Sequence, residues 1–144
     1  MKSFKTFSGI AAPLIRVNID TDAIIPSREI KTVSKKGLSG GLFAEWRYLS
    51  LESRKENPDF ILNQDPFKKA SILVTGNNFG CGSSREHAVW ALSEWGIRAI
   101  IAPSYGSIFY SNCIKNGILP IVMDGRVISS MSEFIKDNPE ENKL

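Results

Sequence analysis

The sequence predicts an α/β fold in which the second half of the chain forms a β-α-β-α-β unit. Two observations support this prediction. Three short apolar runs have the composition of buried strands, and the two stretches between them place apolar residues at helical spacing. Strand–helix–strand connections of this kind join parallel strands, so we expect a parallel sheet. At 144 residues the chain fits one domain, taken as residues 1–144, with residues 136–144 as a frayed polar tail.

Recognisable signals delimit the elements of the second half. The strands are predicted at 71–75, 98–102 and 118–123, and the helices at 84–95 and 107–116. Gly96 and Gly117 follow the helices as stops, and Pro120 places the last strand at an edge or a bulge. Ser83 and Glu86 have the spacing of a capping box. The residues expected to face inward are Ala88, Ala91, Leu92 and Trp95 in the first helix and Ile108, Phe109, Cys113 and Ile114 in the second.

The first half is less regular. Residues 4–15 are expected to form strand and turn, and residues 18–26 a polar loop that enters a short apolar run. Residues 28–33 are expected to form a brief helix, and residues 42–49 a second one. No internal repeat or low-complexity segment is present in the sequence.

A glycine-rich turn, residues 76–88, is the strongest functional signal. It follows a predicted strand, and open α/β sheets bind ligands at the carboxyl ends of their strands. Three glycines bring the backbone close to a ligand, and two hydroxyls precede Arg85. A cation in a first helical turn is unfavourable, so its presence indicates a site for an acid. The sequence is neither a Walker A motif nor G-x-G-x-x-G. The alternative is a well-capped strand–helix turn without a ligand.

Other polar residues have a functional and a structural interpretation. Asp20 and Asp22 could supply a buried acid that orients a cation or a catalytic hydroxyl, or could form a turn or cap before a strand. His87 is the single histidine, which favours packing or hydrogen bonding near the helix start over a metal site. Cys81 lies in the glycine turn, where a nucleophilic role would need a base that the neighbouring sequence does not supply.

Composition excludes several classes of protein. The net charge is +3, from 18 basic and 15 acidic residues that are scattered along the chain, so there is no nucleic-acid footprint. Two cysteines cannot form a four-cysteine metal site. The sequence shows no secretory signal and no apolar run near the ~20 residues that a membrane span needs. We therefore expect a cytoplasmic protein with free thiols and no membrane partner.

Two segments carry a resemblance to a known family. Residues 78–88 (Asn-Phe-Gly-Cys-Gly-Ser-Ser-Arg-Glu-His-Ala) and 18–26 (Asn-Ile-Asp-Thr-Asp-Ala-Ile-Ile-Pro) closely resemble the small subunits of 3-isopropylmalate dehydratases, a family within the aconitase superfamily. The resemblance extends from Phe7 to about Val122. Further agreement lies at 42–43, 46–49, 57–60, 101–104 and 108–110.

The resemblance implies a fold, a reaction and a partner. The fold is the mobile swivelling β/β/α domain of the aconitase C-terminal type, which closes over an active site. The reaction converts 2-isopropylmalate to 3-isopropylmalate in leucine biosynthesis by removing and re-adding water. The [4Fe–4S] cluster is held by a separate large subunit, where its iron acts as a Lewis acid, and this chain carries no cofactor or metal. The ligand is a small dicarboxylate.

The resemblance also implies roles for particular residues. Ser83 is the catalytic base, and Ser84 and Arg85 bind a substrate carboxylate. Asp22 matches an acidic active-site position and is expected to be catalytic, and Ile30 is expected to bind the substrate by meeting its isopropyl group. The chemistry suits these residue types, because backbone N–H groups and a guanidinium can stabilise a serine alkoxide.

Two departures from the family pattern are present, one of which bears on the substrate. Related small subunits usually carry an aromatic residue and then leucine where this chain has Glu29 and Ile30. The chain is also shorter than typical bacterial relatives, and we expect a shortened C-terminal tail to affect pairing with the large subunit. Alternative functions are the same chemistry on citraconate/methylmalate or homoaconitate, and a non-catalytic anion-binding module.

Overall fold

The computed structural model describes residues 8–30, 37–50, 52–83 and 85–138. Its centre is a four-stranded parallel sheet in the order β1-β2-β3-β4. The strands are β1 (Ala11–Leu14), β2 (Ile72–Thr75), β3 (Ala99–Ala102) and β4 (Leu119–Val122). All residues of the first three strands are buried, as in parallel sheets covered on both faces.

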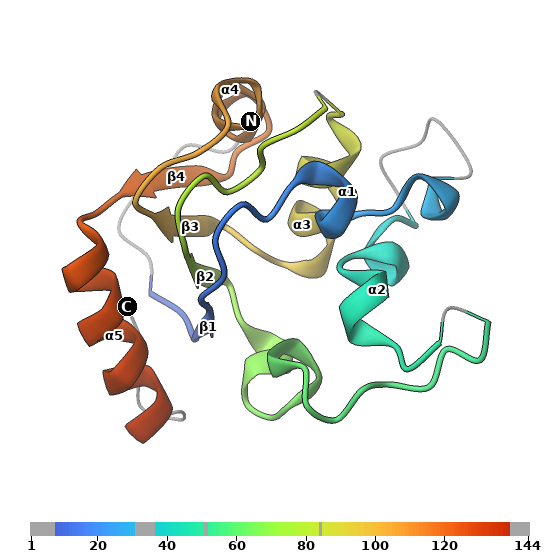
Figure 1. Cartoon of the computed structure of the whole chain (residues 1–144), viewed down its shortest axis with the longest axis horizontal. Coiled ribbons are helices and arrows are strands. Elements are labelled where there is room, and N and C mark those ends of the chain that lie inside the picture. Colours follow the sequence, from blue (N-terminus) through green and yellow to red (C-terminus); the bar gives the residue numbers. More distant parts are fainter. Residues whose placement is uncertain (1–7, 31–36, 51, 84, 139–144) are drawn as a thin grey trace.

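Helices cover the sheet on its two faces. α3 (His87–Trp95) and α5 (Gly125–Asp137) lie on opposite sides of it, and α4 (Ser107–Lys115) packs beside β4 (Figure 1). The first half of the chain adds two one-turn helices, α1 (Thr21–Ile24) and α2 (Ala44–Arg47). It also contains the 3₁₀ turns η1 (Ser27–Glu29), η2 (Ser39–Gly41), η3 (Ile61–Asn63) and η4 (Phe67–Lys69).

The predicted β-α-β-α-β unit is confirmed as β2-α3-β3-α4-β4, with all neighbouring strands parallel. β4 is an edge strand, as Pro120 indicated. Gly96 ends α3 in the left-handed conformation at φ +119°, as expected of a helix stop. The predicted strand in residues 4–15 is β1, which pairs with β2 in register from Ala11–Ile72 to Leu14–Thr75.

Three expectations about α3 and α4 were wrong in detail. α3 begins at His87 rather than at residue 84, so the glycine turn is longer than expected. Ile108 and Ile114 are 54% and 47% exposed, whereas both were expected inside. In α4 the buried residues are Phe109 and Cys113, four residues apart on one face. Ile108 and Ile114, their sequence neighbours, face outward.

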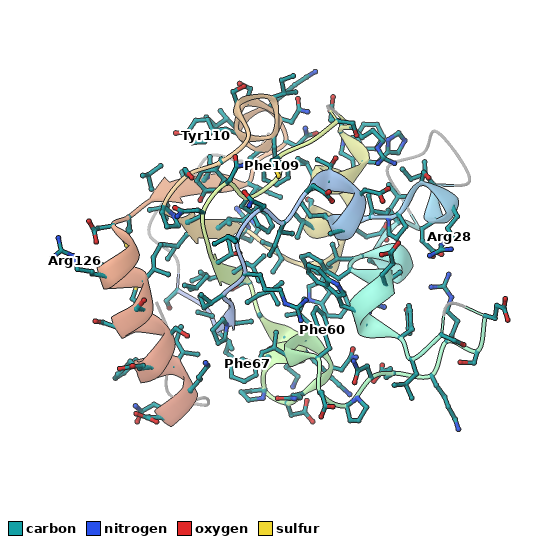
Figure 2. All side chains as sticks on the ribbon, in the orientation of Figure 1. Arg28, Phe60, Phe67, Phe109, Tyr110 and Arg126 are labelled. Atoms are coloured by element: carbon teal, nitrogen blue, oxygen red, sulfur yellow. The ribbon has the colours of Figure 1, made fainter. Side chains whose placement is uncertain are left out.

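α5 was not predicted, and residues 136 and 137, assigned to a frayed tail, are helical. The Asp124 carboxylate caps this helix by accepting a hydrogen bond from the Arg126 amide at 2.8 Å. Ile128 and Ile135, seven residues apart, are buried, and the helix packs on β1, β2 and β3. Figure 2 shows Arg126 pointing away from the sheet.

Candidate functional site

The site lies at the carboxyl ends of β1 and β2, where two loops continue side by side beyond the strands (Figure 1). The Asn18 amide donates to the carbonyl of Asn77 at 2.8 Å, and the Gly80 amide donates to the carbonyl of Ile19 at 2.7 Å. The Thr21 amide donates to the carbonyl of Cys81 at 2.9 Å. Backbone pairing therefore fixes the loop of residues 18–22 against the glycine turn.

The glycine turn and the start of α4 pack too closely for side chains at Gly80 and Gly106. Gly80 has φ +77°, and a Cβ there would lie 2.2 Å from the ring of Phe109. A Cβ on Gly106 would lie 2.6 Å from the carbonyl oxygen of Gly80. The Phe109 ring, which Figure 2 shows on the inner side of α4, also meets Phe79 edge to face. The turn is thus wedged between the loop after β1 and the start of α4.

A hydroxyl–guanidinium cluster forms where the two loops meet. Arg85 Nε donates to Ser83 Oγ at 3.2 Å, and Arg85 Nη2 donates to Asp22 Oδ1 at 3.1 Å. Thr21 Oγ1 donates to the Ser83 carbonyl at 2.9 Å and lies 3.2 Å from Ser83 Oγ. Three of the predicted site residues, Ser83, Arg85 and Asp22, are therefore brought together by the fold.

The Arg85–Asp22 ion pair serves orientation more than stability. The Arg85 side chain is 27% exposed and that of Asp22 is 58% exposed, so water screens their attraction. A guanidinium has five N–H donors, and the contacts with Ser83 and Asp22 use two of them. Arg85 can therefore keep these contacts and still bind an anion in the solvent-accessible space beside Ser83.

The predicted capping box at Ser83 and Glu86 is wrong. Glu86 is the N-cap residue of α3, and no side chain caps this helix by a hydrogen bond. The Ser83 hydroxyl interacts with Thr21 and Arg85 instead. Arg85 consequently precedes the helix rather than occupying its first turn, so the unfavourable interaction with the helix dipole does not arise. Its position is explained by its contacts with Ser83 and Asp22.

Glu86 has a structural role between two helices. Its Oε2 accepts hydrogen bonds from Trp90 Nε1 at 3.2 Å and Asn116 Nδ2 at 3.1 Å, and Lys115 Nζ lies 3.5 Å from Oε1. The Asn116 hydrogen bond and the nearby Lys115 charge lower the pKa of Glu86, against the effect of burial. The ionised carboxylate thus ties the start of α3 to the end of α4.

A cavity of about 150 Å³ adjoins the cluster. Ser83 and Cys81 line it on the side of the glycine turn, and Ser107, Ile108 and Phe109 line it on the side of α4. The cavity therefore offers a polar edge at Ser83 and an apolar wall from α4, which suits a small acid that carries an alkyl group.

Asp20 and His87 follow their structural interpretations. Asp20 Oδ1 accepts a hydrogen bond from the Ala23 amide at 2.7 Å, so Asp20 caps a helix, α1, rather than preceding a strand. The His87 ring packs edge to face on Trp90 with centroids 4.9 Å apart.

The two cysteines lie in different environments. Cys81 is half-buried in the wall of the cavity, whereas Cys113 is buried in α4 and desolvation raises the pKa of its thiol to about 12. Both are free thiols. Within the described ranges, no group of three or more His, Cys, Asp or Glu side chains could hold a metal ion.

Two predicted site residues remain, Ser84 and Ile30. Ser84 lies outside the described residues. Ile30 is half-buried against the hydrophobic core, and the contacts among Ser83, Thr21 and Arg85 do not involve it.

Glu29, which departs from the family pattern, pairs with Arg54. Its side chain is 8% exposed and forms an ion pair with Arg54, whose pKa is raised mainly by this hydrogen bond. A Cβ on Gly41 would lie 2.5 Å from Glu29 Cβ, so the acidic side chain fills the space that this glycine leaves. Glu29 therefore completes a local ion pair.

Thr21 is a site residue that the sequence pattern did not predict. It is 2% exposed and contacts Ser83 with its hydroxyl. The available signal was its place between Asp20 and Asp22, but threonine between two acids is also ordinary for a helix start.

No helix among the described residues has the length and apolarity needed to cross a membrane.

The chain is similar to known proteins over most of its length. The sequence profile of the aconitase C-terminal domain matches residues 1–126, a range that includes both segments of the site. A 3-isopropylmalate dehydratase small subunit from Cupriavidus necator is 58% identical over 133 residues, covering 92% of this chain and 64% of the relative. One from Leptospira interrogans is 51% identical over 138 residues, covering 96% and 67%.

A solved structure agrees with these similarities. The crystal structure of 3-isopropylmalate dehydratase from Methanocaldococcus jannaschii superposes with a TM-score of 0.61 at 34% identity, covering 83% of this chain and 63% of that one. This chain thus spans less than two thirds of the length of the first relative, 64%, and 67% of the second.

Proposed function

The chain belongs to the aconitase C-terminal domain family, and on this premise we propose that it is the small subunit of a hydro-lyase, 3-isopropylmalate dehydratase. One observation carries the proposal: Arg85 lies within hydrogen-bond distance of both Ser83 Oγ and Asp22, beside a cavity of about 150 Å³. A guanidinium next to a hydroxyl at such a cavity can bind a carboxylate and stabilise an alkoxide. The names of the relatives support the substrate.

In the proposed reaction Ser83 is the general base. Its ionised Oγ takes the proton from the carbon next to a substrate carboxylate. The C–H electron pair becomes the new C=C bond, and hydroxide leaves the neighbouring carbon with the C–O pair. Water then adds back with its hydroxyl on the other carbon, which interconverts 2-isopropylmalate and 3-isopropylmalate. This is a step of leucine biosynthesis.

Arg85 and Ser84 bind the carboxylate in this proposal, and Asp22 keeps the guanidinium of Arg85 facing Ser83. Asp22 is then a positioning residue, because its contact is with Arg85 and not with the reacting carbon. The apolar wall at Ile108 and Phe109 borders the same cavity as Ser83, whereas Ile30 packs against the core. We therefore place the substrate's alkyl group against α4.

The iron–sulfur cluster is assigned to a large subunit. The described residues do not fit such a cluster, because Cys113 is buried in the core and Cys81 has no grouping of potential ligands around it. This chain is then active only when paired with a large subunit, and its own side chains bind the acid and move the proton. Free thiols at both cysteines support a reducing, cytoplasmic location.

The test is to co-express the chain with a candidate large subunit and to measure turnover of 2-isopropylmalate. We expect turnover to require both chains, and Ser83→Ala to reduce it by at least about 10²-fold, the usual scale for a lost general base. Co-purification with the large subunit controls for assembly. Near-normal turnover of Ser83→Ala would show that Ser83 is not the general base.

The same preparation distinguishes the alternatives. Preference for citraconate/methylmalate or homoaconitate over 2-isopropylmalate would change the substrate but keep the chemistry. Binding of a dicarboxylate by this chain alone, with no turnover when the large subunit is present, would indicate a non-catalytic anion-binding module instead.

A further inference from the structure

Thr21 is a buried residue whose hydroxyl has two acceptors on one neighbour. Its Oγ1 donates to the Ser83 carbonyl at 2.9 Å and lies 3.2 Å from Ser83 Oγ. A threonine hydroxyl has a single proton. While that proton points to the carbonyl, Thr21 can only accept in its contact with Ser83 Oγ, so the proton between the two hydroxyls belongs to Ser83.

This arrangement changes when Ser83 ionises. An alkoxide oxygen can only accept hydrogen bonds, and it accepts one from Arg85 Nε already. The Thr21 proton can reach it by rotation of the hydroxyl about the Cβ–Oγ1 bond, because both acceptors lie within 3.2 Å. A hydrogen bond to a charged oxygen is stronger than one to a neutral carbonyl, so ionisation favours the rotated state.

We propose that Thr21 is the positioning residue for the base, turning its hydroxyl proton from the Ser83 carbonyl to Ser83 Oγ when Oγ loses its own proton. The proposal rests on the function proposed above for Ser83. Ser83 is exposed, so its proton leaves to solvent while the O–H electron pair stays on Oγ. No covalent bond of Thr21 breaks. When Oγ then takes the substrate proton, the Thr21 hydroxyl returns to the carbonyl.

The surroundings hold Thr21 in place for this role. The residue is 2% exposed, its amide donates to the Cys81 carbonyl at 2.9 Å and its carbonyl accepts from the Ile25 amide at 3.0 Å. Its rotation is therefore confined to the hydroxyl, which lowers the cost of reorganisation.

The charged groups near this pair come mainly from the two loops. Arg85 contacts Ser83 directly, and Asp22 reaches it through Arg85. The Asp20 carboxylate is engaged by the Ala23 amide, and the Cys81 thiol lies in the cavity wall. From α4, the described lining residues are Ser107, Ile108 and Phe109, which bring no charge.

The first experiment uses the assembled enzyme with Thr21→Val, which removes the hydroxyl at nearly constant shape, and Thr21→Ser, which keeps it. We expect Thr21→Val to lower kcat by about tenfold or more with little change in KM, and Thr21→Ser to lose much less. The rising limb of the pH profile should move to higher pH in Thr21→Val alone. An unmoved profile, or equal losses in the two variants, would overturn the proposal.

The second experiment needs no turnover and no large subunit. In a Cys81→Ala, Ser83→Cys background, the rate of alkylation by iodoacetamide at pH 7 reports how much thiolate forms at position 83. Adding Thr21→Val should slow alkylation by about tenfold, because one hydrogen bond to the anion is lost. Adding Thr21→Ser should not. The buried Cys113 provides an internal unreactive reference in intact protein.

Together with Ser83→Ala, the two experiments distinguish a failure of the proposed function from a failure of the role proposed for Thr21. If Ser83→Ala keeps near-normal turnover, the proposed function fails, while the alkylation rates still decide whether Thr21 stabilises an anion at this position. If Ser83→Ala is inactive but Thr21→Val changes neither the pH profile nor the alkylation rate, the role of Thr21 alone is wrong. Circular dichroism of each variant verifies that it is folded.

Discussion

Arg85 illustrates how one side chain can organise a site without stabilising the fold. Its Nε contacts Ser83 and its Nη2 contacts Asp22. Asp22 lies 63 residues away from Arg85 in the sequence. The exposure of the Arg85–Asp22 pair limits its contribution to about 1 kcal/mol or less. The value of the arginine is therefore its rigid, forked geometry.

Replacing Arg85 by lysine should affect substrate handling before stability. A lysine ammonium on a flexible stem cannot keep the fork that contacts Ser83 and Asp22 and also binds a carboxylate. In the assembled enzyme we expect Arg85→Lys to raise KM by about tenfold or more, with the thermal unfolding midpoint nearly unchanged. Arg126→Lys, at a side chain that is 96% exposed, is the matched control. Kinetics like those of the unmodified chain would mean that substrate binding does not need the Arg85 guanidinium.

At this scale the sequence predicted residue types better than contacts. Ser83, Arg85 and Asp22 were identified by motif and resemblance, and the structure brings them together. Thr21 was missed because its role depends on pairing between two distant loops, which no local pattern records. Ile30 was assigned from its position after Pro26, but its packing depends on tertiary contacts.

At the scale of elements, the glycine turn and the start of α4 are fitted against each other. Gly80→Ala would place a Cβ 2.2 Å from the Phe109 ring in a backbone at φ +77°. We expect a loss of about 1–3 kcal/mol in the free energy of unfolding, as for an overpacked core, together with reduced turnover.

The control for this change is Gly125→Ala, because a Cβ on Gly125 would meet nothing within 4 Å. Urea denaturation of both variants, monitored by circular dichroism, provides the comparison. If Gly80→Ala and Gly125→Ala unfolded at the same urea concentration, the close packing of the turn on α4 would be wrong.

Three elements show where the sequence pattern was sufficient and where it was not. β3 and α4 were predicted within one residue at each end, because apolar runs and glycine stops mark them. The start of α3 was misplaced because Ser83 and Glu86 imitate a capping box while their side chains serve other partners. A spacing shows which hydrogen bonds are possible, and tertiary contacts decide which form.

At the scale of the whole molecule, α5 covers the face of the sheet opposite α3 (Figure 1). The family profile ends at residue 126, so most of this helix lies beyond the matched region. Its inward residues, Ile128 and Ile135, are nevertheless buried in the same core as β1 and β2. The helix is therefore part of the domain's hydrophobic core.

Truncating a buried side chain of α5 tests this conclusion. Ile135 is fully buried, so Ile135→Ala should lower the free energy of unfolding by about 2–4 kcal/mol through lost burial and a cavity. Val127→Ala, on the same helix but 49% exposed, should change it by less than about 1 kcal/mol. Equal effects in a urea titration would mean that α5 does not pack on the sheet as described.

The overall architecture was predicted correctly as α/β with a parallel sheet, and the resemblance to the aconitase superfamily is confirmed by the match over residues 1–126. α5 was missed although Asp124, Ile128 and Ile135 carry the signals of a cap and an apolar stripe. Its many polar residues make that apolar stripe a weak signal in the sequence. The pairing of β1 with β2 connects segments about 60 residues apart, which only the folded chain reveals.

The backbone pairing between the loop of residues 18–22 and the glycine turn has a consequence for the order of events during synthesis. Thr21 and Asp22 emerge about 60 residues before Ser83 and Arg85, and their contacts require β1 and β2 to be aligned. Closing so long a segment is entropically costly, so these contacts form late. A nascent or partly unfolded chain therefore contains Asp22 and Ser83 but has no assembled site. The site forms only in chains in which β1 has paired with β2.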